Sequence, residues 1–206
     1  MSALTPAFVG ACVLLALTPG PDMAFYVART LSGGRRLGFA ALAGVMAGLL
    51  AHALAAALGL SALLAASAGA YRIVKWVGAA YLAWLAIDVL RHGSALRLAG
   101  GVPRGPGATF LSGLGINLTN PKIILFFVTF LPQFVAAGDP AAPMKFLTLG
   151  LIFLVVGSLV SALVVLVAGR FVALMKAKPR ALRIFDFVTA GVLGSFAVRL
   201  ATSPGR

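Results

Sequence analysis

Two short motifs break long apolar segments at prolines that lie 100 residues apart, Pro21 and Pro121. The first motif reads Thr18-Pro19-Gly20-Pro21-Asp22, and the second reads Asn117-Leu118-Thr119-Asn120-Pro121-Lys122. A helix in lipid must satisfy its own backbone hydrogen bonds, so a break is tolerated only where protein or water receives the freed groups. Proline-interrupted spans at matching positions of two halves are typical of the binding site of a transporter. The two motifs therefore mark the candidate site.

The composition requires a membrane environment. Hydrophobic residues make up 61% of the 206 residues, charged residues make up 10%, and the mean hydropathy is +1.06. A soluble domain of this size could not cover so much apolar surface. At about 20 residues per span, the chain has room for six transmembrane helices. Because Met1–Pro6 has no basic residues, we expect the first segment to be a retained span rather than a cleaved signal peptide.

The order of the segments predicts an all-α membrane protein built from two related halves. Aligning Pro21 with Pro121 places a proline-broken segment first in each half, then a Gly-bearing segment, then a shorter one. Because three is an odd number, the second half enters the membrane in the opposite sense, which gives two inverted three-helix repeats. We expect a single transporter domain over 1–206, with a first repeat over about 1–92, a linker over about 93–107 and a second repeat over about 108–206. The predicted apolar segments are Leu4–Val27, Phe39–Ala66, Ile73–Leu90, Ala108–Ala137, Met144–Ala168 and Ile184–Leu200.

The net charge of +13 comes from basic residues that lie mostly in the loops between apolar segments. There they orient the chain and meet the anionic headgroups of the lipid bilayer. No aromatic and basic platform supports nucleic-acid binding, and we expect none. Cys12 is the single cysteine, so neither a disulfide within the chain nor a cysteine metal site is expected. We predict no metal and no cofactor.

Asp22 and Lys122 are ionisable residues placed directly after the two breaks. An acid within a span faces the bundle interior or an aqueous cavity, and Asp22 also lies where a new half-helix should begin. Its alternative role is that of a helix cap near the interface. Lys122 lies too deep in its segment to reach either surface easily. It either binds a substrate carboxylate, with the amides near Asn120 and Pro121, or holds the fold by pairing with Asp22 or with carbonyl dipoles.

The remaining candidate substrate-binding residues surround these two. Thr18, Asn117, Thr119 and Asn120 can bond a substrate or the broken backbone, while Pro19, Gly20, Pro21 and Pro121 create the breaks. In the second span, Gly44 and Gly48 form a small-residue face for close helix packing, and His52 continues it. His52 is either a hydrogen-bonded residue between helices or a proton relay or substrate contact.

At these residues the chain resembles the lysine exporter and homoserine/threonine resistance superfamily (LysE/RhtB) of bacterial amino-acid efflux proteins. The matching features are the run at 18–22, the spacing of Gly44, Gly48 and Gly59, the run at 78–85 and the run at 117–122. The resemblance covers essentially the whole chain. It implies six spans in the bacterial inner membrane and export of amino acids or close derivatives, driven by a proton or cation gradient.

The leading functional hypothesis is a secondary exporter that binds a zwitterionic substrate. Lys122 would meet the substrate carboxylate, and Asp22 would meet the ammonium. A passive channel is an alternative that would require a pore built by oligomerisation, and a homo-oligomer is left open. A membrane-embedded enzyme is a second alternative, for which only His52 is a base within a span, and we expect no enzymatic activity.

Loop charges predict the orientation of the chain. Eleven basic residues fall in the first, third and fifth loops, and five fall on the opposite face. The positive-inside rule then places Arg35, Arg36 and the Arg170–Arg183 loop in the cytoplasm. Single cysteines introduced there, in a Cys12→Ser background, should resist labelling by an impermeant maleimide in intact cells. Strong labelling from outside would overturn the orientation.

Overall fold

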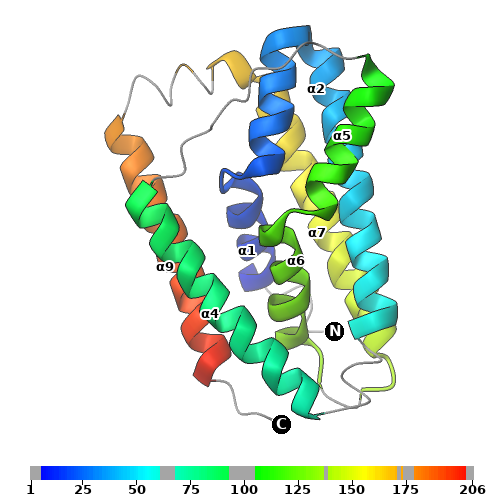
Figure 1. The fold of residues 1–206 in the computed structure, drawn as a ribbon, viewed down its shortest axis with the longest axis vertical. Coiled ribbons are helices and arrows are strands. Elements are labelled where there is room, and N and C mark those ends of the chain that lie inside the picture. The colour runs from blue at the N-terminus through cyan, green and yellow to red at the C-terminus, as the bar shows by residue number, and fades with distance from the viewer. Residues whose placement is uncertain are drawn as a thin grey trace.

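The computed structural model describes residues 6–60, 68–92, 105–136, 139–170, 173 and 179–202, and all regular structure in these ranges is helical. The prediction of an all-α chain is confirmed for these ranges, and most of the predicted linker lies outside them. Figure 1 shows the helices running along one long axis. In chain order the elements are α1 (Pro6–Leu17), α2 (Pro21–Ala55), η2 (Ala56–Leu60), α4 (Ala68–His92), α5 (Pro106–Leu118), α6 (Pro121–Leu125), η3 (Phe126–Phe130), η4 (Leu131–Phe134), α7 (Ala142–Leu166) and α9 (Pro179–Thr202).

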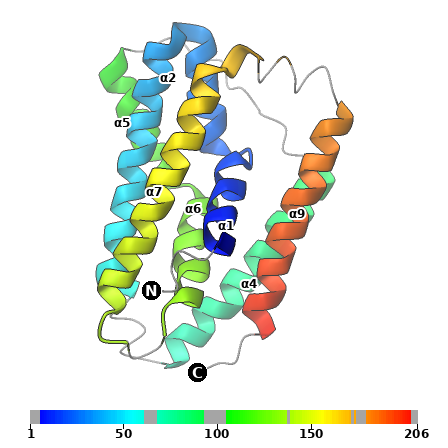
Figure 2. The same ribbon diagram turned by 180° about the vertical axis from the view of Figure 1, so that it is seen from behind.

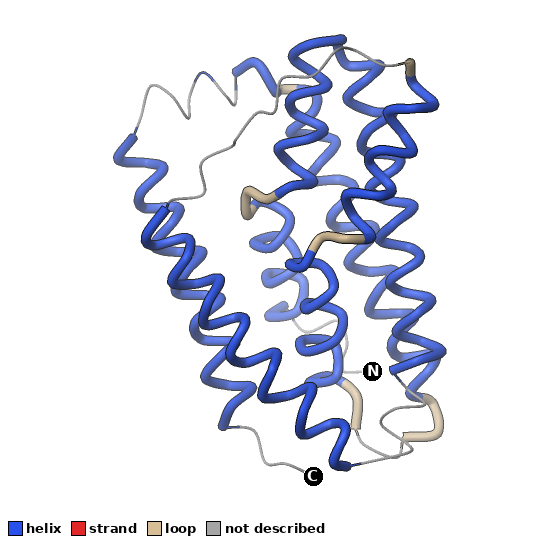
Figure 3. Tube along the Cα trace, in the orientation of Figure 1, coloured by secondary structure: helices blue, strands red, loops and turns tan. Residues whose placement is uncertain are grey.

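Both predicted breaks are present. Helix α1 ends at Leu17 and α2 begins at Pro21, while α5 ends at Leu118 and α6 begins at Pro121. A proline is tolerated in the first helical turn because its missing N–H would have no partner there. The tan connections of Figure 3 show both breaks, and the two broken segments run in opposite directions, α1 towards the top and α5 towards the bottom. This arrangement is the one that an inverted repeat requires.

The polar stretch between the predicted segments Leu4–Val27 and Phe39–Ala66, expected to be a loop, is mostly helical. Within α2 the backbone leaves helical angles only at Gly33 and Gly34, and Gly34 has a φ of 76°. Glycine adopts such a positive φ without a steric penalty. Figures 1 and 2 show α2 rising in blue to this turn and descending in cyan. Two glycines therefore reverse the chain where the sequence suggested a longer loop.

By length and apolar composition, two described stretches qualify as membrane spans, Ala142–Leu166 and Pro21–Gly59, the second of which includes the turn at Gly33–Gly34. The pair Pro106–Leu118 and Pro121–Phe134 makes a third candidate if it counts as one span, bent by 48° at its break. Helix α4 packs against α9, and α5 and α7 pack against α2. Six spans in two inverted repeats stay a prediction.

Small residues allow α2 and α5 to cross closely. A Cβ on Gly44 would lie 2.0 Å from the carbonyl oxygen of Phe110, and one on Gly113 would lie 2.4 Å from that of Ala41. One turn beyond Gly44, a Cβ on Gly48 would meet Asn117 Oδ1 at 2.6 Å. The predicted small-residue face is confirmed, and it explains the crossing, since lipid gives helices no hydrophobic drive to associate.

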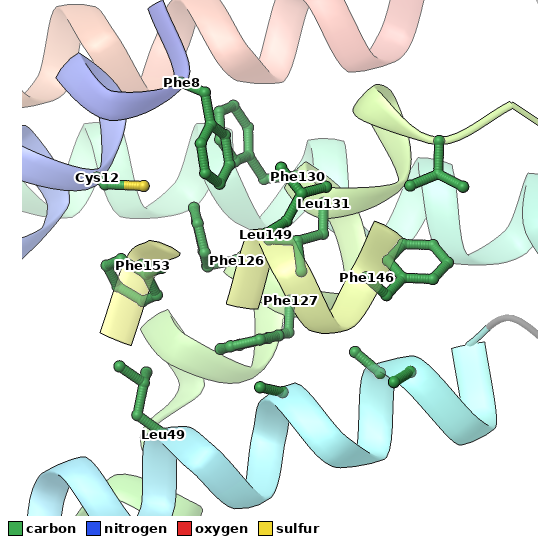
Figure 4. Packing of buried hydrophobic residues seen from close by; sticks show 14 of the residues in the cluster. Phe8, Cys12, Leu49, Phe126, Phe127, Phe130, Leu131, Phe146, Leu149 and Phe153 are labelled. Carbon is green, nitrogen blue, oxygen red and sulfur yellow. The ribbon is translucent and has the colours of Figure 1, made fainter. Parts of the chain in front are cut away.

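Two apolar clusters lie on either side of the breaks. The larger cluster contains Phe8 of α1, which stacks on Phe130 at 6.0 Å and meets Phe134 edge-on at 4.9 Å between ring centroids. Figure 4 shows how α1, α7 and the segment after Pro121 contribute to it. The smaller cluster lies nearer the turn at Gly33–Gly34 and joins α2 to α7. Its buried residues are Met23, Tyr26, Val27, Ala41, Leu42, Val164, Val165 and Ala168.

Charge also separates the two ends of the helices. Arg35 and Arg36 flank the turn of α2, and Arg35 donates a hydrogen bond of 2.9 Å to the Leu166 carbonyl at the end of α7. At the opposite end of α7, Lys145 pairs with Asp139, and this contact lowers the pKa of the Asp139 carboxyl. The ion pair with Asp139 neutralises the charge of Lys145 at the end of the protein that carries fewer basic residues. We call the end at Gly33–Gly34 the basic end.

The close α2–α5 crossing can be tested with two alanine substitutions. Gly44→Ala should lower the melting temperature of the purified protein, because the new Cβ would overlap the Phe110 carbonyl unless the helices separate. Gly115→Ala is the matched control on α5, where nothing lies within 4 Å of the new Cβ. Alanine is favoured over glycine in a helix by roughly 0.5–1 kcal/mol, so this control should melt at or above the wild-type temperature. Equal melting of Gly44→Ala and wild type would contradict the crossing.

Candidate functional site

The two broken segments meet through the side chain of Lys122. Its Nζ donates hydrogen bonds to the carbonyl oxygens of Leu15, at 3.2 Å, and Thr18, at 2.9 Å. In a continuous helix the Leu15 carbonyl would accept from residue 19, but Pro19 has no N–H to give. A cation at this helix C-terminus also meets the negative end of the helix dipole. Lys122 therefore supplies from the second motif the donors that the first motif lost.

Gly20 leaves room for this contact. A Cβ at position 20 would lie 3.2 Å from Lys122 Nζ and 3.5 Å from its Cε, which is closer than most such contacts. The φ of Gly20 is −166°, an extended value open to any residue, so backbone strain does not demand glycine here. Space for the lysine is the physical reason for a glycine between the two prolines.

Asp22 and Asn117 form the second contact between the motifs. Asn117 Nδ2 donates to Asp22 Oδ2 at 2.9 Å, and Asn117 and Asp22 are 0% and 7% exposed, respectively. The other side-chain oxygen of each, Asp22 Oδ1 and Asn117 Oδ1, is buried without a hydrogen-bond partner. Buried polar atoms without partners are costly and rare in folded proteins. Unpaired oxygens of this kind are suited to receive the donors of a ligand.

Asp22 and Lys122 do not bond to each other directly. The carboxylate bonds to Asn117 and the ammonium bonds to two carbonyls, although the two charges still attract through space. Of the roles considered for Lys122, binding to carbonyl dipoles is the one observed, and the direct ion pair is not. Both charges thus keep bonding capacity for a ligand, since an ammonium has three donors and a carboxylate has two acceptor oxygens.

A small cavity adjoins these groups. Its volume is about 40 Å³. Since a water occupies about 30 Å³ in the liquid, this space suits one or two waters and is too small for an amino acid. Residues of both apolar clusters contribute to its lining. In this conformation the site therefore has no room for an amino acid. The lining residues are Leu15, Ala16, Asp22, Met23, Tyr26, Val45, Met46, Leu49, Asn117, Lys122, Ile123, Phe153, Gly157 and Ser161.

The polar residues of the second break serve the backbone. Asn120 caps α6, because its Oδ1 accepts a hydrogen bond of 3.0 Å from the amide of Lys122. The amide of Ile123 donates to the Asn120 carbonyl. The backbone amides expected to bind a carboxylate at this break are therefore already paired, and the donors that remain are the Lys122 ammonium and the Asn120 side-chain amide. Asn120 Nδ2 is buried without a hydrogen bond of standard geometry, and the Asn120 side chain interacts with the Asp22 carboxylate.

Two threonines and a proline lie away from the cavity. Thr119 is exposed, and its hydroxyl bonds to the Gly115 carbonyl of its own helix. Thr18 is buried, and its hydroxyl bonds to the Leu14 carbonyl at 2.7 Å. Pro121 is exposed. These residues, together with Pro19 and Gly20, shape the breaks and do not line the cavity.

His52 contacts the site through the backbone of Asn117. Its Nε2 lies 3.2 Å from the carbonyl oxygen of Asn117, and its ring stacks on Phe127 at 5.7 Å. It lines a separate hollow of about 300 Å³, together with residues of η2 and of the segment after Pro121. Of its two predicted roles, the structure shows the hydrogen bond between helices. His52 does not line the small cavity, and its hydrogen bond to Asn117 connects it to a residue that does.

Tyr26 and Ser161 line the cavity, although the sequence did not mark them as site residues. The hydroxyl of Tyr26 donates to Ser161 Oγ at 3.3 Å, and both residues are buried. Tyr26 lies one helical turn after Asp22, so the helical period could have identified it. Ser161 belongs to α7, and nothing in the sequence reveals that α7 faces the breaks. In the described ranges, no group of three His, Cys, Asp or Glu residues could hold a metal.

The chain is similar in sequence to known membrane proteins over most of its length. The chain is 33% identical over 171 residues to the homoserine/homoserine lactone efflux protein of Salmonella typhimurium, covering 82% of each chain. It is 35% identical over 155 residues to an uncharacterized membrane protein of Vibrio cholerae, covering 75% of each. An uncharacterized membrane protein of Pseudomonas aeruginosa is 32% identical over 211 residues, covering 95% of this chain and 94% of the relative. No solved structure matches.

The family comparison covers both motifs and all of the helices except the start of α1. The family described as "LysE type translocator" matches residues 13–204, which include Asp22, Asn117 and Lys122. Translocators move a substrate across a membrane without converting it, so the chain is a membrane transporter and not an enzyme. The protein belongs to the LysE type translocator family.

Proposed function

We propose that this protein is a gradient-driven exporter of amino acids or close derivatives across the bacterial inner membrane. The single observation that carries the proposal is the buried meeting point of the two broken segments. There Lys122 presents a positive charge, and Asp22 and Asn117 present unpartnered oxygens. Charges within a membrane are costly, and they are kept where a function uses them. Opposite charges that do not bond to each other are complementary to a zwitterion.

In the bound state, each end of the zwitterion has a receiver. The substrate carboxylate takes the remaining donor of Lys122, whose other bonds go to Leu15 and Thr18. The substrate ammonium donates to Asp22 Oδ1 and Asn117 Oδ1, which have no partner without it. Hydrogen bonds to charged groups contribute about 1.5–3 kcal/mol each, so both ends together give selective binding.

Transport requires the cavity to open to one side at a time. The larger apolar cluster lies towards the end where α7 begins, and the smaller cluster lies towards the basic end. The broken segments divide between the two halves of the chain, so rocking one half against the other would open the first cluster while the second stays packed, and then the reverse. A cavity of about 40 Å³, too small for the substrate, fits a state between the two openings.

The relatives support the substrate class. The Salmonella typhimurium relative is named a homoserine/homoserine lactone efflux protein, and it matches most of this chain. Asp22 is the only acid among the residues that line the cavity. We therefore place substrate and coupling at the same carboxylate, where a proton or cation from outside would compete with the substrate ammonium. Because the substrate and the proton or cation would occupy this carboxylate in turn, export of the substrate would be coupled to entry of the proton or cation, which is antiport.

Transport by purified protein in liposomes tests the proposal. Vesicles loaded with unlabelled homoserine should accumulate labelled homoserine by counterflow, which a channel cannot produce. Lys122→Ala should be nearly inactive and less stable, because the Leu15 and Thr18 carbonyls and Asp22 lose their partner charge. Asp22→Asn should keep partial export with an altered pH dependence. The double change of Asp22→Asn with Lys122→Gln should regain membrane abundance without transport.

Two results would contradict this account. Full counterflow in Lys122→Ala would make the lysine a structural residue only. Uptake that merely equilibrates, with no transient accumulation above the outside concentration, would identify a channel. Arg36→Gln is a suitable control, because it removes an exposed positive charge far from the cavity.

A further inference from the structure

The cavity has a second polar side that the zwitterion does not use. Tyr26 and Ser161 face each other across it from α2 and α7, and their hydroxyls are joined by the 3.3 Å hydrogen bond. Ser161 accepts this bond, and its own proton has no acceptor among the residues that the structure describes. A hydroxyl is both a donor and an acceptor, so this pair offers a ligand one further bond of either kind.

Its position suits the side chain of an amino acid. Tyr26 follows Asp22 by four residues on α2, which is about 6 Å along the helix axis. Both side chains line the same cavity, so a substrate whose ammonium is held at Asp22 extends its side chain towards Tyr26. This spacing persists when α2 moves as a unit, because both residues lie before the turn at Gly33–Gly34.

The other walls around this side are apolar. Met23, Met46 and Phe153 line the cavity beside the hydroxyl pair, and no acid other than Asp22 does so. A second ammonium on the substrate would therefore meet no counter-charge in a site closed by apolar residues. Burying an unpaired charge costs far more than burying a hydroxyl that finds a partner. The site thus discriminates against basic side chains.

We propose that Tyr26 and Ser161 form the side-chain subsite of this transporter and select small substrates with an uncharged hydrogen-bonding group. The inference rests on the proposed function, because it takes the orientation of the substrate from Asp22 and Lys122. A site that hydrogen-bonds a substrate hydroxyl discriminates strongly against an analogue without it, since the buried groups of the site are then left unpaired. Size is limited by the apolar walls.

Three isosteric substrates test the subsite. Homoserine carries a hydroxyl at the end of its side chain, and norvaline carries a methyl group in that position. The third substrate, 2,4-diaminobutyrate, carries an ammonium there and is called the ammonium analogue. Wild-type liposomes should transport homoserine with a kcat/KM about tenfold above that of norvaline, the effect of about one hydrogen bond. The ammonium analogue should be transported least. Competition with labelled homoserine gives all three values in one assay.

Variants then assign the preference to the two hydroxyls. Ser161→Ala and Tyr26→Phe remove them with little change of shape, and each should bring the homoserine-to-norvaline ratio close to one, chiefly by lowering homoserine transport. Ser158→Ala is the matched control on α7, because Ser158 bonds to its own helix at Val155 and does not line the cavity. It should keep the wild-type ratio.

The outcomes separate the subsite from the function on which it rests. A ratio that survives both substitutions, or equal transport of the ammonium analogue, overturns the subsite while counterflow of homoserine keeps the proposed function. Absence of transport for all three substrates overturns the subsite as well. In that case, counterflow with a panel of other amino acids decides whether the proposed function fails with it.

Discussion

The structure depends on how a broken helix satisfies its carbonyl groups inside an apolar bundle. Pro19 leaves the Leu15 carbonyl without its helical donor, and no water from a lipid phase can replace it. Lys122 of the other half supplies that donor and bonds to Thr18 as well. The lysine is at the same time a costly charge at depth. Lys122 of the second half thus satisfies the free carbonyls of the first half, and those carbonyls stabilise its buried charge. The two breaks must therefore lie together.

The close crossing of α2 and α5 positions the other polar residues of the site. Gly48 permits Asn117 to lie against α2, and Asn117 there reaches Asp22 with its side chain. The carbonyl of Asn117 bonds to His52 one turn further along α2. One asparagine therefore connects the carboxylate, the helix crossing and the histidine. Its side-chain oxygen is buried beside Gly48 without a hydrogen-bond partner.

Much of this arrangement could be predicted from the sequence, because proline chemistry is local. The breaks follow from Pro21 and Pro121, and the glycine face follows from the spacing of Gly44 and Gly48. The choice between an ion pair and carbonyl binding for Lys122 could not be made, because it depends on distances between segments about 100 residues apart in the chain. Ser161 was missed for the same reason, since only the packing of α7 brings it to the cavity. Thr119 resembled a ligand group, but the helix around it directs its hydroxyl to its own backbone.

The central claim is that Lys122 has two roles, as the partner of the broken helix and as the receiver of the substrate carboxylate. The most direct measurement compares the affinity of the purified protein for homoserine and for homoserine amide, which lacks the negative charge. Wild type should bind the free acid at least tenfold more tightly, as expected for a charge-assisted hydrogen bond. Lys122→Met, studied at a temperature where it is shown to be folded, should bind the two with equal affinity. A preference for the free acid that persists in Lys122→Met would contradict the account and show that another group binds the carboxylate.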